Sequence, residues 1–321
     1  MRKRLRLFSF VQICVFCIGL SLCFGKDALI VKNGCYVPLF KIRNWGKEFD
    51  LQKDEEEHLE LSYEVGPYGT NCEDLVTVLL PKTLLEVSKR GNKLSHVIWH
   101  VNKNKLFHGL VHNQFLSKCC DVISEEDFTW EQHPMTLTEI GSFFKELIEH
   151  NPPYCWGGNY IGKIVLPGDY KLTQKKNEEG EPLAEGEYQL RGFDCSGLLY
   201  FISGGLLEHS SRRLREYKDG KLLWRIGKND IVSVEDLKKR LTGLKLQDSD
   251  CIVVIGHVVV WYNEGLLEFR GKDCGCVYTK GEEAVVGRLM ELIKQSRVRP
   301  EGDSDVRWIR WHPELLEENA K

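Results

Sequence analysis

The sequence lacks an excess of charge of either sign. Its 321 residues include 44 lysines and arginines against 47 aspartates and glutamates, which gives a formal net charge of −3. The four basic residues before Lys26 lie at the extreme N-terminus, where there is no acidic residue; without them the balance is 40 against 47, or −7. Such a chain has no general electrostatic attraction for nucleic acid.

Long internal repeats and biased composition are also absent. Hydrophobic residues make up 42% of the chain and charged residues 28%, which are ordinary globular values. They exclude a disordered, collagen-like or multi-spanning membrane protein. The length suggests about two domains and is ample for a hydrophobic core. The 12 cysteines are too few for a disulfide scaffold, yet they are the unusual feature of the composition.

Residues 1–25 have the layout of a secretory signal peptide. A basic head precedes 19 residues whose only strongly polar member is Gln12, and Gly25 is a small residue at the end. This pattern predicts an exported protein, periplasmic or associated with the cell envelope. The apolar run is also just long enough to span a bilayer, so a retained membrane anchor is the alternative. A lipoprotein at Cys23 is disfavoured because Leu22 stands where a small residue is needed.

Residues 26–128 are predicted to form a β-rich domain built as a small barrel. Short apolar, β-branched runs alternate with clusters of Gly, Asn and Lys, which is typical of strands and turns. The runs cover residues 28–31, 35–42, 75–80, 96–101 and 106–111. The acidic run at residues 54–57 is interpreted as a solvated loop.

Residues 129–321 show helices and strands in alternation. Helical periodicity predicts a helix over 136–149, capped by Thr138 and stopped by Asn151-Pro152-Pro153. A buried helix is predicted from Cys195 to Gly204-Gly205, and a capping box of Ser233 with Asp236 starts another that Gly243 ends. The remaining elements are a loop or insertion at 160–192, one central strand over 251–263, a strand at 266–270, a helix at 282–295 and a last strand at 308–311.

Cys195 and His257 are the candidate catalytic pair. Cys195 stands at a predicted helix start, where unpaired N–H groups and the positive dipole end favour a thiolate. His257 lies in a row of Val and Ile and needs a polar partner. A nearby imidazolium would lower the thiol's pKa and complete the ion pair that a thiol nucleophile requires. The Cys195 backbone N–H would help to form an oxyanion hole.

Glu268 is the candidate for orienting His257. A four-residue connection over 262–265 pairs Trp261 with Leu266 and Val259 with Glu268. Glu268 then lies on the face of His257, one diagonal step of about 7–8 Å away, which only a long side chain spans. A two-residue turn is expected to move Glu268 out of reach.

Three short segments carry a resemblance to a known family. They are Tyr154-Cys155-Trp156-Gly157-Gly158-Asn159, then Phe193-Asp194-Cys195-Ser196-Gly197-Leu198, then Gly256-His257-Val258-Val259. In this order they resemble the NlpC/p60 family of cysteine peptidases, papain-like enzymes that cut stem peptides of the bacterial cell wall. The resemblance covers residues 135–321. It implies an α+β fold in which the helix bearing Cys packs on an antiparallel sheet bearing His. By analogy with the family, residues 26–128 are expected to form a bacterial SH3-like barrel.

The resemblance also implies roles. Cys195 would be the nucleophile, His257 the base and Glu268 the third polar residue. Tyr154 would border the oxyanion hole, and the positions of Asp194 and Ser196 bind a free substrate α-amine in some members. Five residues would contact substrate: Tyr154, Trp156, Gly157, Asp194 and Ser196. No cofactor and no metal are implied.

The chain departs from the family's pattern in two places. The third residue is more often His, Asn or Gln and usually lies one position further on; a Glu there would hold His257 by a charged hydrogen bond. The Tyr and Cys segments are normally close together, whereas here 160–192 separates them. We interpret this insertion as a wall or lid over the site, with a surface loop as the alternative.

The subgroup that the chain resembles accepts small peptides with a free L-Ala terminus and cuts after γ-D-Glu, before diaminopimelate. This predicts a γ-D-glutamyl–diaminoacid endopeptidase acting on peptidoglycan-derived peptides, with intact wall as the alternative substrate. Two other classes remain open. One is a wall-binding or scaffolding protein with a degenerate catalytic domain, and the other is a cysteine amidase or acyltransferase.

Other polar clusters are less informative. His96 and His100 are four apart, as are His108 and His112, but on strands such pairs lie about 13 Å apart and disfavour zinc. The basic run 212–215 is interpreted as a solvated face, with contact to a substrate carboxylate as the alternative. Eight cysteines remain besides Cys195 and those of the signal, an even number that permits disulfides without pairing them.

Overall fold

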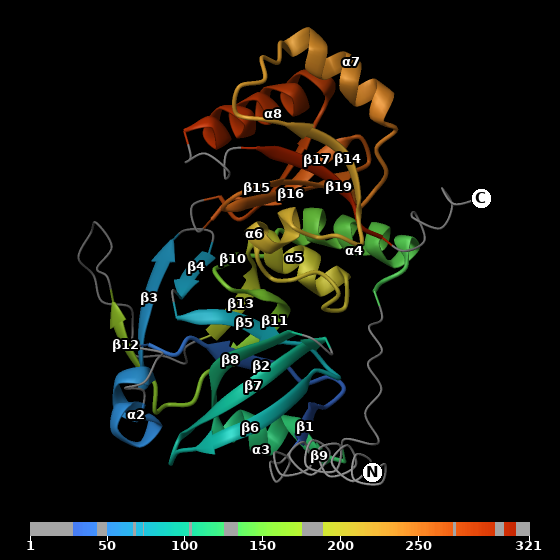
Figure 1. Ribbon diagram of the computed structural model, residues 1–321. Coiled ribbons are helices and arrows are strands. Elements are labelled where there is room, and N and C mark those ends of the chain that lie inside the picture. The colour runs from blue at the N-terminus through green and yellow to red at the C-terminus, as the bar shows by residue number, and fades with distance from the viewer. Residues whose placement is uncertain are drawn as a thin grey trace, which may run out of the picture.

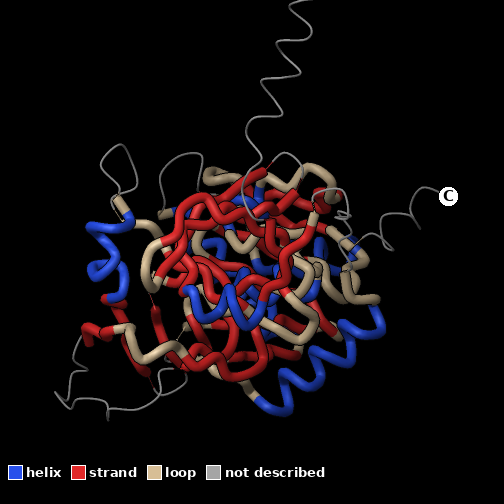
Figure 2. Tube along the Cα trace, turned by 90° about the horizontal axis from the view of Figure 1, so that it is seen from below, coloured by secondary structure: helices blue, strands red, loops and turns tan. Residues whose placement is uncertain are grey.

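The computed structural model is mixed α and β and contains three sheets (Figure 1). It describes residues 28–43, 50–66, 69–72, 74–102, 105–124, 134–174, 189–271, 274–298 and 305–312. The expected signal segment and the expected domain boundary between residues 128 and 129 lie outside these ranges. Within them, no helix is long and apolar enough to cross a membrane. Figure 2 shows strands gathered in the middle of the molecule and several helices at its edges.

The first sheet is antiparallel and curled, and it fills the lower half of Figure 1. Its order is β5-β2-β8-β7-β6-β1-β9. Its strands are β1 (Ala28–Val31), β2 (Val37–Phe40), β5 (Leu75–Leu79), β6 (Leu84–Arg90), β7 (Leu94–Asn102), β8 (Lys105–His112) and β9 (Cys120–Ile123). The predicted strands of this region are confirmed in kind, with shifts of a residue or two at their ends. The SH3-like barrel stays a prediction.

The acidic run at 54–57 is not a loop, and the interpretation as a solvated loop is wrong. It lies in helix α2 (Leu51–Leu59). Glu55 is buried because its Oε1 accepts the backbone N–H groups of Lys93 and Leu94, both at 2.7 Å. These partners lie 38 and 39 residues further along the chain, so the local sequence carries no sign of them.

The second sheet joins the two halves of the chain. Its order is β11-β13-β10-β4-β3-β12, and β10 pairs in parallel with β4 while β12 pairs in parallel with β3. Its strands are β3 (Glu60–Gly66), β4 (Gly69–Cys72), β10 (Tyr154–Cys155), β11 (Asn159–Val165), β12 (Lys171–Gln174) and β13 (Gln189–Phe193). The described parts of the predicted insertion at 160–192 therefore belong mainly to this sheet; residues 175–188 lie outside the described ranges.

The third sheet is antiparallel, with the order β14-β19-β15-β16-β17-β18. Its strands are β14 (Lys221–Ile226), β15 (Cys251–Val254), β16 (His257–Tyr262), β17 (Gly265–Phe269), β18 (Cys276–Lys280) and β19 (Val306–Arg310). The remaining helices are α3 (Asn113–Cys119), α4 (Leu137–His150), α5 (Cys195–Ile202), α6 (Ser211–Arg215), α7 (Val234–Leu244) and α8 (Glu282–Arg297). In Figure 1, α4, α5 and α6 lie between the first and third sheets, whereas α7 and α8 lie at the top, on the other side of the third sheet.

Alternation along β16 divides the third sheet between two cores. Val258 and Val260 pack with α4 and α5, and Val259 packs with α8. The helix that begins at Cys195 is buried almost all round, as predicted, and Leu198 shares the first of these cores. The sequence of β16 thus fixes which side of the sheet faces the Cys195 helix, because successive side chains point to opposite faces.

Two helix predictions are confirmed and two helix boundaries are corrected. The Ser233–Asp236 capping box starts α7, and α8 covers the predicted range. The prediction that Gly243 ends α7 is wrong, because Gly243 lies inside the helix, which ends at Leu244 with Lys245 as its left-handed C-cap. The cap of α4 is Thr136 and not Thr138: its side chain accepts the Glu139 N–H, and the Glu139 carboxylate accepts the Thr136 N–H. This reciprocal arrangement satisfies two N–H groups that the helix start leaves free.

The predicted single strand over 251–263 is a hairpin. Gly256, with φ of +84°, turns β15 into β16, so Val254 pairs with His257. The next turn has two residues, since Tyr262 itself pairs with Gly265. The expected pairing of Trp261 with Leu266 is nevertheless present, and continuing it places Glu268 opposite Val259. The expectation that a two-residue turn displaces Glu268 was wrong. The turn is shorter only because Tyr262 and Gly265 form one more pair of the ladder, and this extra pair leaves the register of the other pairs unchanged.

Candidate active site

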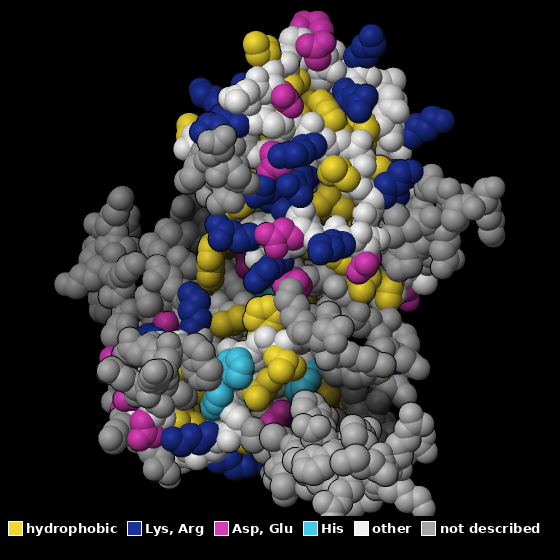
Figure 3. Space-filling view, in the orientation of Figure 1, with side chains coloured by type: hydrophobic (Ala, Val, Ile, Leu, Met, Phe, Trp, Pro, Cys, Tyr) yellow, Lys and Arg dark blue, Asp and Glu magenta, His cyan; other side chains and the backbone are white. Residues whose placement is uncertain are grey.

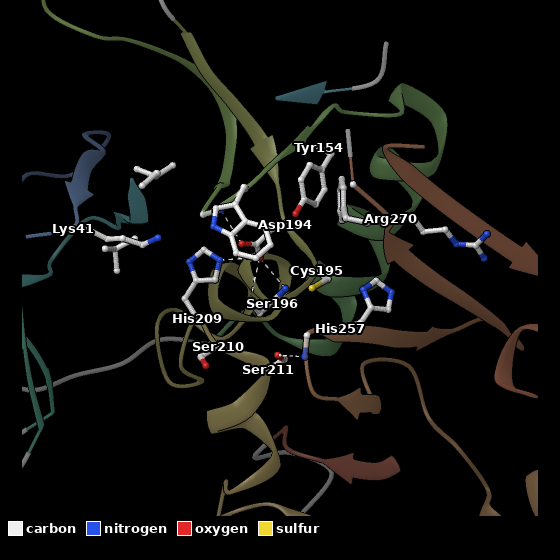
Figure 4. Close-up of a pocket in the computed structure, with 17 residues that line it drawn as sticks. Lys41, Tyr154, Asp194, Cys195, Ser196, His209, Ser210, Ser211, His257 and Arg270 are labelled. Carbon is white, nitrogen blue, oxygen red and sulfur yellow. Dashed lines mark hydrogen bonds and ion pairs between the residues drawn. The ribbon is translucent and has the colours of Figure 1, made fainter. Parts of the chain in front are cut away.

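A pocket of about 380 Å³ lies where the three predicted segments meet. Figure 4 shows Tyr154, Asp194, Cys195 and His257 around it, with Ser196 beside them. Its full lining is Lys41, Leu75, Val76, Tyr154, Trp156, Gly157, Asp194, Cys195, Ser196, His209, Ser210, Ser211, Gly256, His257, Phe269, Arg270 and Gly271. The first sheet contributes through Leu75 and Val76 of β5, so the pocket draws on both halves of the chain.

Glycines make the close packing around Cys195 sterically accessible. A Cβ on Gly197 would lie 1.9 Å from the Gly158 carbonyl oxygen, and a Cβ on Gly158 would lie 2.5 Å from that of Gly192. Gly157 has φ of +71° and packs against the Leu75 carbonyl. These approaches explain the glycines in both motifs, because no other residue fits at such separations.

Asp194 begins α5 and places Cys195 at its first position. Its Oδ1 accepts the N–H groups of Ser196 at 2.9 Å and Gly197 at 2.7 Å. The same carboxylate accepts the Gly157 N–H through Oδ2 at 2.9 Å. The Cys195 segment is therefore tied to the Tyr154–Asn159 segment through one buried side chain, while the Cys195 N–H is left out of this cap.

His257 is held by Glu268, as the sequence predicts. His257 Nε2 lies 2.6 Å from Glu268 Oε2. A carboxylate only accepts, so Nε2 carries the proton and the neutral ring has its lone pair on Nδ1. No other described residue makes a hydrogen bond to the His257 ring. Nδ1 is thus the nitrogen left to accept a proton in the pocket.

Two arginines also donate hydrogen bonds to Glu268, and no sequence motif indicated either of them. Arg270 Nη2 donates to Oε1 at 2.6 Å, while Arg288 donates through Nε to Oε1 and through Nη2 to Oε2, both at 2.8 Å. The Glu268 side chain is fully buried. Burial alone would raise its pKa, but the hydrogen bonds from His257, Arg288 and Arg270 outweigh burial and hold the pKa well below the ordinary value. Glu268 is therefore a fixed anion.

The Cys195 thiol lies beside the His257 strand and is half-buried. Burial, followed by the Asp194 carboxylate, raises the pKa of this thiol, while the N–H groups of Val258, Ser196 and Cys195 itself act in the opposite direction. The N–H groups at the helix start act in the expected direction, but burial and the neighbouring anion outweigh them. A thiolate here requires transfer of the proton to a base, and His257, next to Val258, is the base that the pocket offers.

Tyr154 directs its hydroxyl toward Asp194 and Cys195 in Figure 4. Burial raises its pKa strongly, and the charges of Asp194 and Cys195 add to the effect. The hydroxyl therefore keeps its proton and is a permanent hydrogen-bond donor at the pocket. Trp156 is 47% exposed and lines the same pocket, so it offers an apolar surface at the mouth.

The Asp194 carboxylate is already well supplied with donors. Besides its three backbone partners it accepts from the Ser196 hydroxyl at 3.1 Å and lies 2.8 Å from His209 Nε2. Four of these five donors reach Oδ1, and one, the Gly157 N–H, reaches Oδ2. Each carboxylate oxygen offers about two acceptor positions, so Oδ2 keeps one for a substrate amine. His209 lines the pocket and was not singled out by any motif; its partners lie on segments far apart in the sequence.

Several predicted clusters lie away from the pocket. The face in Figure 3 carries many Lys and Arg side chains over its upper half. Within the basic run, Arg215 is buried in an ion pair with Asp305, and Arg213 pairs with Glu216. None of the basic run and none of the described part of 160–192 lines the pocket. Among the described residues, no group of three or more potential metal ligands is assembled.

Comparisons with solved structures gave several weak likenesses, including two NlpC proteins. No family model and no curated protein matches the chain. The structure of NlpC2 from Trichomonas vaginalis aligns with 79% of this chain and 92% of its own, at 10% identity and a TM-score of 0.29. NlpC1 from the same organism aligns with 79% of this chain and 87% of its own, at 10% identity and a TM-score of 0.22. TM-scores this low carry no argument about function.

Proposed function

We propose that this chain is an exported cysteine peptidase of the NlpC/p60 type, which hydrolyses the bond between γ-D-Glu and diaminopimelate in peptidoglycan-derived peptides. The observation that supports it most is the alignment of three groups: the Cys195 thiol beside Val258, the His257 ring next to it, and Glu268 holding His257 Nε2. This is the order of nucleophile, base and orienting group that acyl transfer requires.

The proposed reaction begins with transfer of the thiol proton to His257 Nδ1. The Cys195 sulfur then attacks the γ-glutamyl carbonyl carbon, and the oxyanion that forms is stabilised by the Cys195 N–H, which the Asp194 cap does not use, and by the Tyr154 hydroxyl. The imidazolium gives its proton to the departing amine, which leaves a thioester. Water, deprotonated by His257, hydrolyses the thioester and restores the thiol.

Glu268 suits this cycle because its charge is constant. Its pKa lies below the ordinary range, so it stays ionised while His257 gains and loses a proton. The charge of Glu268 therefore stabilises the imidazolium that forms in the first step. Arg270 and Arg288 temper that stabilisation, since they share the same carboxylate.

The test uses L-Ala-γ-D-Glu-diaminopimelate, with its α-amine free or acetylated, and follows products by mass spectrometry. We expect cleavage of the free peptide and none by Cys195→Ala. Failure to cut either peptide would refute the hydrolase proposal. Equal cleavage of both would refute a role for Asp194 in amine recognition, a role that rests on the single open position at Oδ2.

A further inference from the structure

A second histidine–carboxylate pair lies on the other side of Cys195. His209 Nε2 is 2.8 Å from Asp194 Oδ1, and His209 Nδ1 is 2.8 Å from Thr77 Oγ1. Figure 4 shows His209 and His257 on opposite sides of Cys195. The His209 side chain is 3% exposed and stacks on Tyr200, with ring centroids 5.7 Å apart and an interplanar angle of 20°. The ring is thus fixed on both edges and one face.

The partner on the far side of His209 belongs to the first sheet. Thr77 is fully buried on β5, at the edge of that sheet. The same strand holds the Tyr154–Asn159 segment: Val78 exchanges two hydrogen bonds with the Asn159 side chain, at 3.1 and 2.7 Å. His209 is therefore part of a seam that joins β5 to the segments around Cys195.

Hydrogen-bond chemistry fixes how the bridge is made. Asp194 is ionised and only accepts, so His209 Nε2 carries a proton. In the neutral ring Nδ1 then accepts from the Thr77 hydroxyl, and in the protonated ring Nδ1 donates to Thr77 Oγ1. In both states every hydrogen bond of the chain Thr77–His209–Asp194 is satisfied, which gives the carboxylate a single position.

We propose that His209 is a positioning residue for the reaction proposed above, which holds the Asp194 carboxylate between β5 and the first turn of α5 and thereby keeps the Cys195 thiol reactive. A role of His209 in peptide cleavage rests on the proposed function. The dependence of Cys195 reactivity on the hydrogen bonds from Thr77 through His209 to Asp194 does not, because it can be measured without a substrate.

The electrostatics of Asp194 support this role. Burial would raise the pKa of Asp194, but the charge and hydrogen bond of His209, with the N–H groups of Gly197 and Gly157, hold it below its ordinary value. Without His209 the carboxylate has two outcomes. If it stays ionised with fewer donors, its field on the Cys195 thiol grows; if it takes a proton, the cap of α5 weakens. Both outcomes lower the reactivity of the thiol.

The experiment measures the alkylation rate of Cys195 in the full chain, because alkylation needs no substrate. The protein is treated with iodoacetamide at several pH values, and the peptide that contains Cys195 is quantified by mass spectrometry. The titratable or charged residues that line the pocket with His209 are Lys41, Tyr154, Asp194, Cys195, His257 and Arg270. Circular dichroism and thermal unfolding report whether each variant is folded.

Three variants separate the bridge from simple packing. His209→Leu should slow alkylation at neutral pH about tenfold or more, the value expected for a lost charge-assisted hydrogen bond. His209→Gln, whose amide donates to Asp194 and accepts from Thr77, should recover to within about threefold of the wild type. Thr77→Val, which keeps the shape of the side chain and removes the hydroxyl, should slow alkylation about two- to tenfold.

The control is His100→Leu, which removes a histidine 3.8 Å from a carboxylate, that of Glu86, elsewhere on the first sheet. It should leave the Cys195 rate unchanged. The inference is overturned if folded His209→Leu and Thr77→Val both react at the wild-type rate, or if Gln rescues nothing. If the variants show the expected alkylation rates but the wild-type protein cuts no peptide, the proposed function is refuted and the positioning role of His209 is retained.

Discussion

Replacing Glu268 with Gln changes one atom and should inactivate the enzyme that we propose. Each Glu268 oxygen accepts two donors: Oε1 from Arg270 and Arg288, and Oε2 from Arg288 and His257. Gln has one oxygen and one amide NH2. If the NH2 takes the Oε1 position, it meets two guanidinium N–H groups, which cannot give up their protons.

The Oε2 position is less unfavourable for the NH2, because one of its two neighbours is a histidine. His257 can move its proton from Nε2 to Nδ1 and accept from the amide. That tautomer presents an N–H to Cys195 where a lone pair is needed, so the base is lost. A wrong tautomer of this kind costs about 10⁴-fold in a serine triad, and we expect kcat/KM of Glu268→Gln to fall about 10³–10⁴-fold. Arg288 is half-buried and Arg270 is exposed, so loss of their charged hydrogen-bond partner should cost about 1.5–3 kcal/mol of unfolding free energy.

The assay is kcat/KM on the γ-D-Glu–diaminopimelate peptide, with ¹⁵N NMR of His257 to report the tautomer. Glu291→Gln is the matched control: it also contacts Arg288, at 2.9 Å, but its side chain is 63% exposed. It should retain activity within about twofold, since exposed pairs contribute little. Activity of folded Glu268→Gln within threefold of the wild type, or a proton still on Nε2, would refute the reasoning.

Other substitutions test the pocket and its packing. Tyr154→Phe should lower kcat about 10–100-fold with little change in KM, because it removes a donor to the oxyanion; an equal rise in KM would point to substrate binding instead. Gly197→Ala should cost about 3 kcal/mol of stability in chemical denaturation, since its Cβ would lie 1.9 Å from the Gly158 oxygen, whereas Gly141→Ala has open space and should be neutral or stabilising. Glu268 has a depressed pKa, so its stabilisation is present above about pH 4.3 and is lost as pH falls toward the folded pKa. Thermal unfolding of Glu268→Gln should therefore depend less on pH below about 4.3 than that of the wild type.

Local signals predicted elements well where the partners are local. The Ser233–Asp236 box lies within four residues, and α7 starts where it predicts. The prediction of a solvated loop at 54–57 failed because Glu55 is paired with backbone N–H groups distant in the sequence. The prediction of a single strand over 251–263 failed for a different reason. The segment is uniformly apolar, so its sequence does not show the turn that the positive φ of Gly256 makes between the two strands.

The same division holds in the site. The contact between His257 and Glu268 was predictable because a hairpin register fixes their relative places, whereas Cys195 was indicated by its motif. Arg288 and His209 were not. Arg288 reaches Glu268 from α8, 20 residues later, and His209 reaches Thr77 across 132 residues. Nothing in a one-dimensional pattern distinguishes such a residue from an ordinary surface Arg or His.

Two buried carboxylates act in opposite directions on the Cys195–His257 ion pair of the proposed reaction. Glu268 favours the ion pair, because its charge lies against the imidazole that must become positive. Asp194 disfavours it, because its charge lies beside the sulfur that must become negative. Asp194 cannot simply be neutral, since it accepts the N–H groups that open α5 and the Gly157 N–H. The fold therefore needs this anion for structure while the chemistry needs it screened, and a histidine bonded directly to Oδ1 is the side chain in the pocket that can do both.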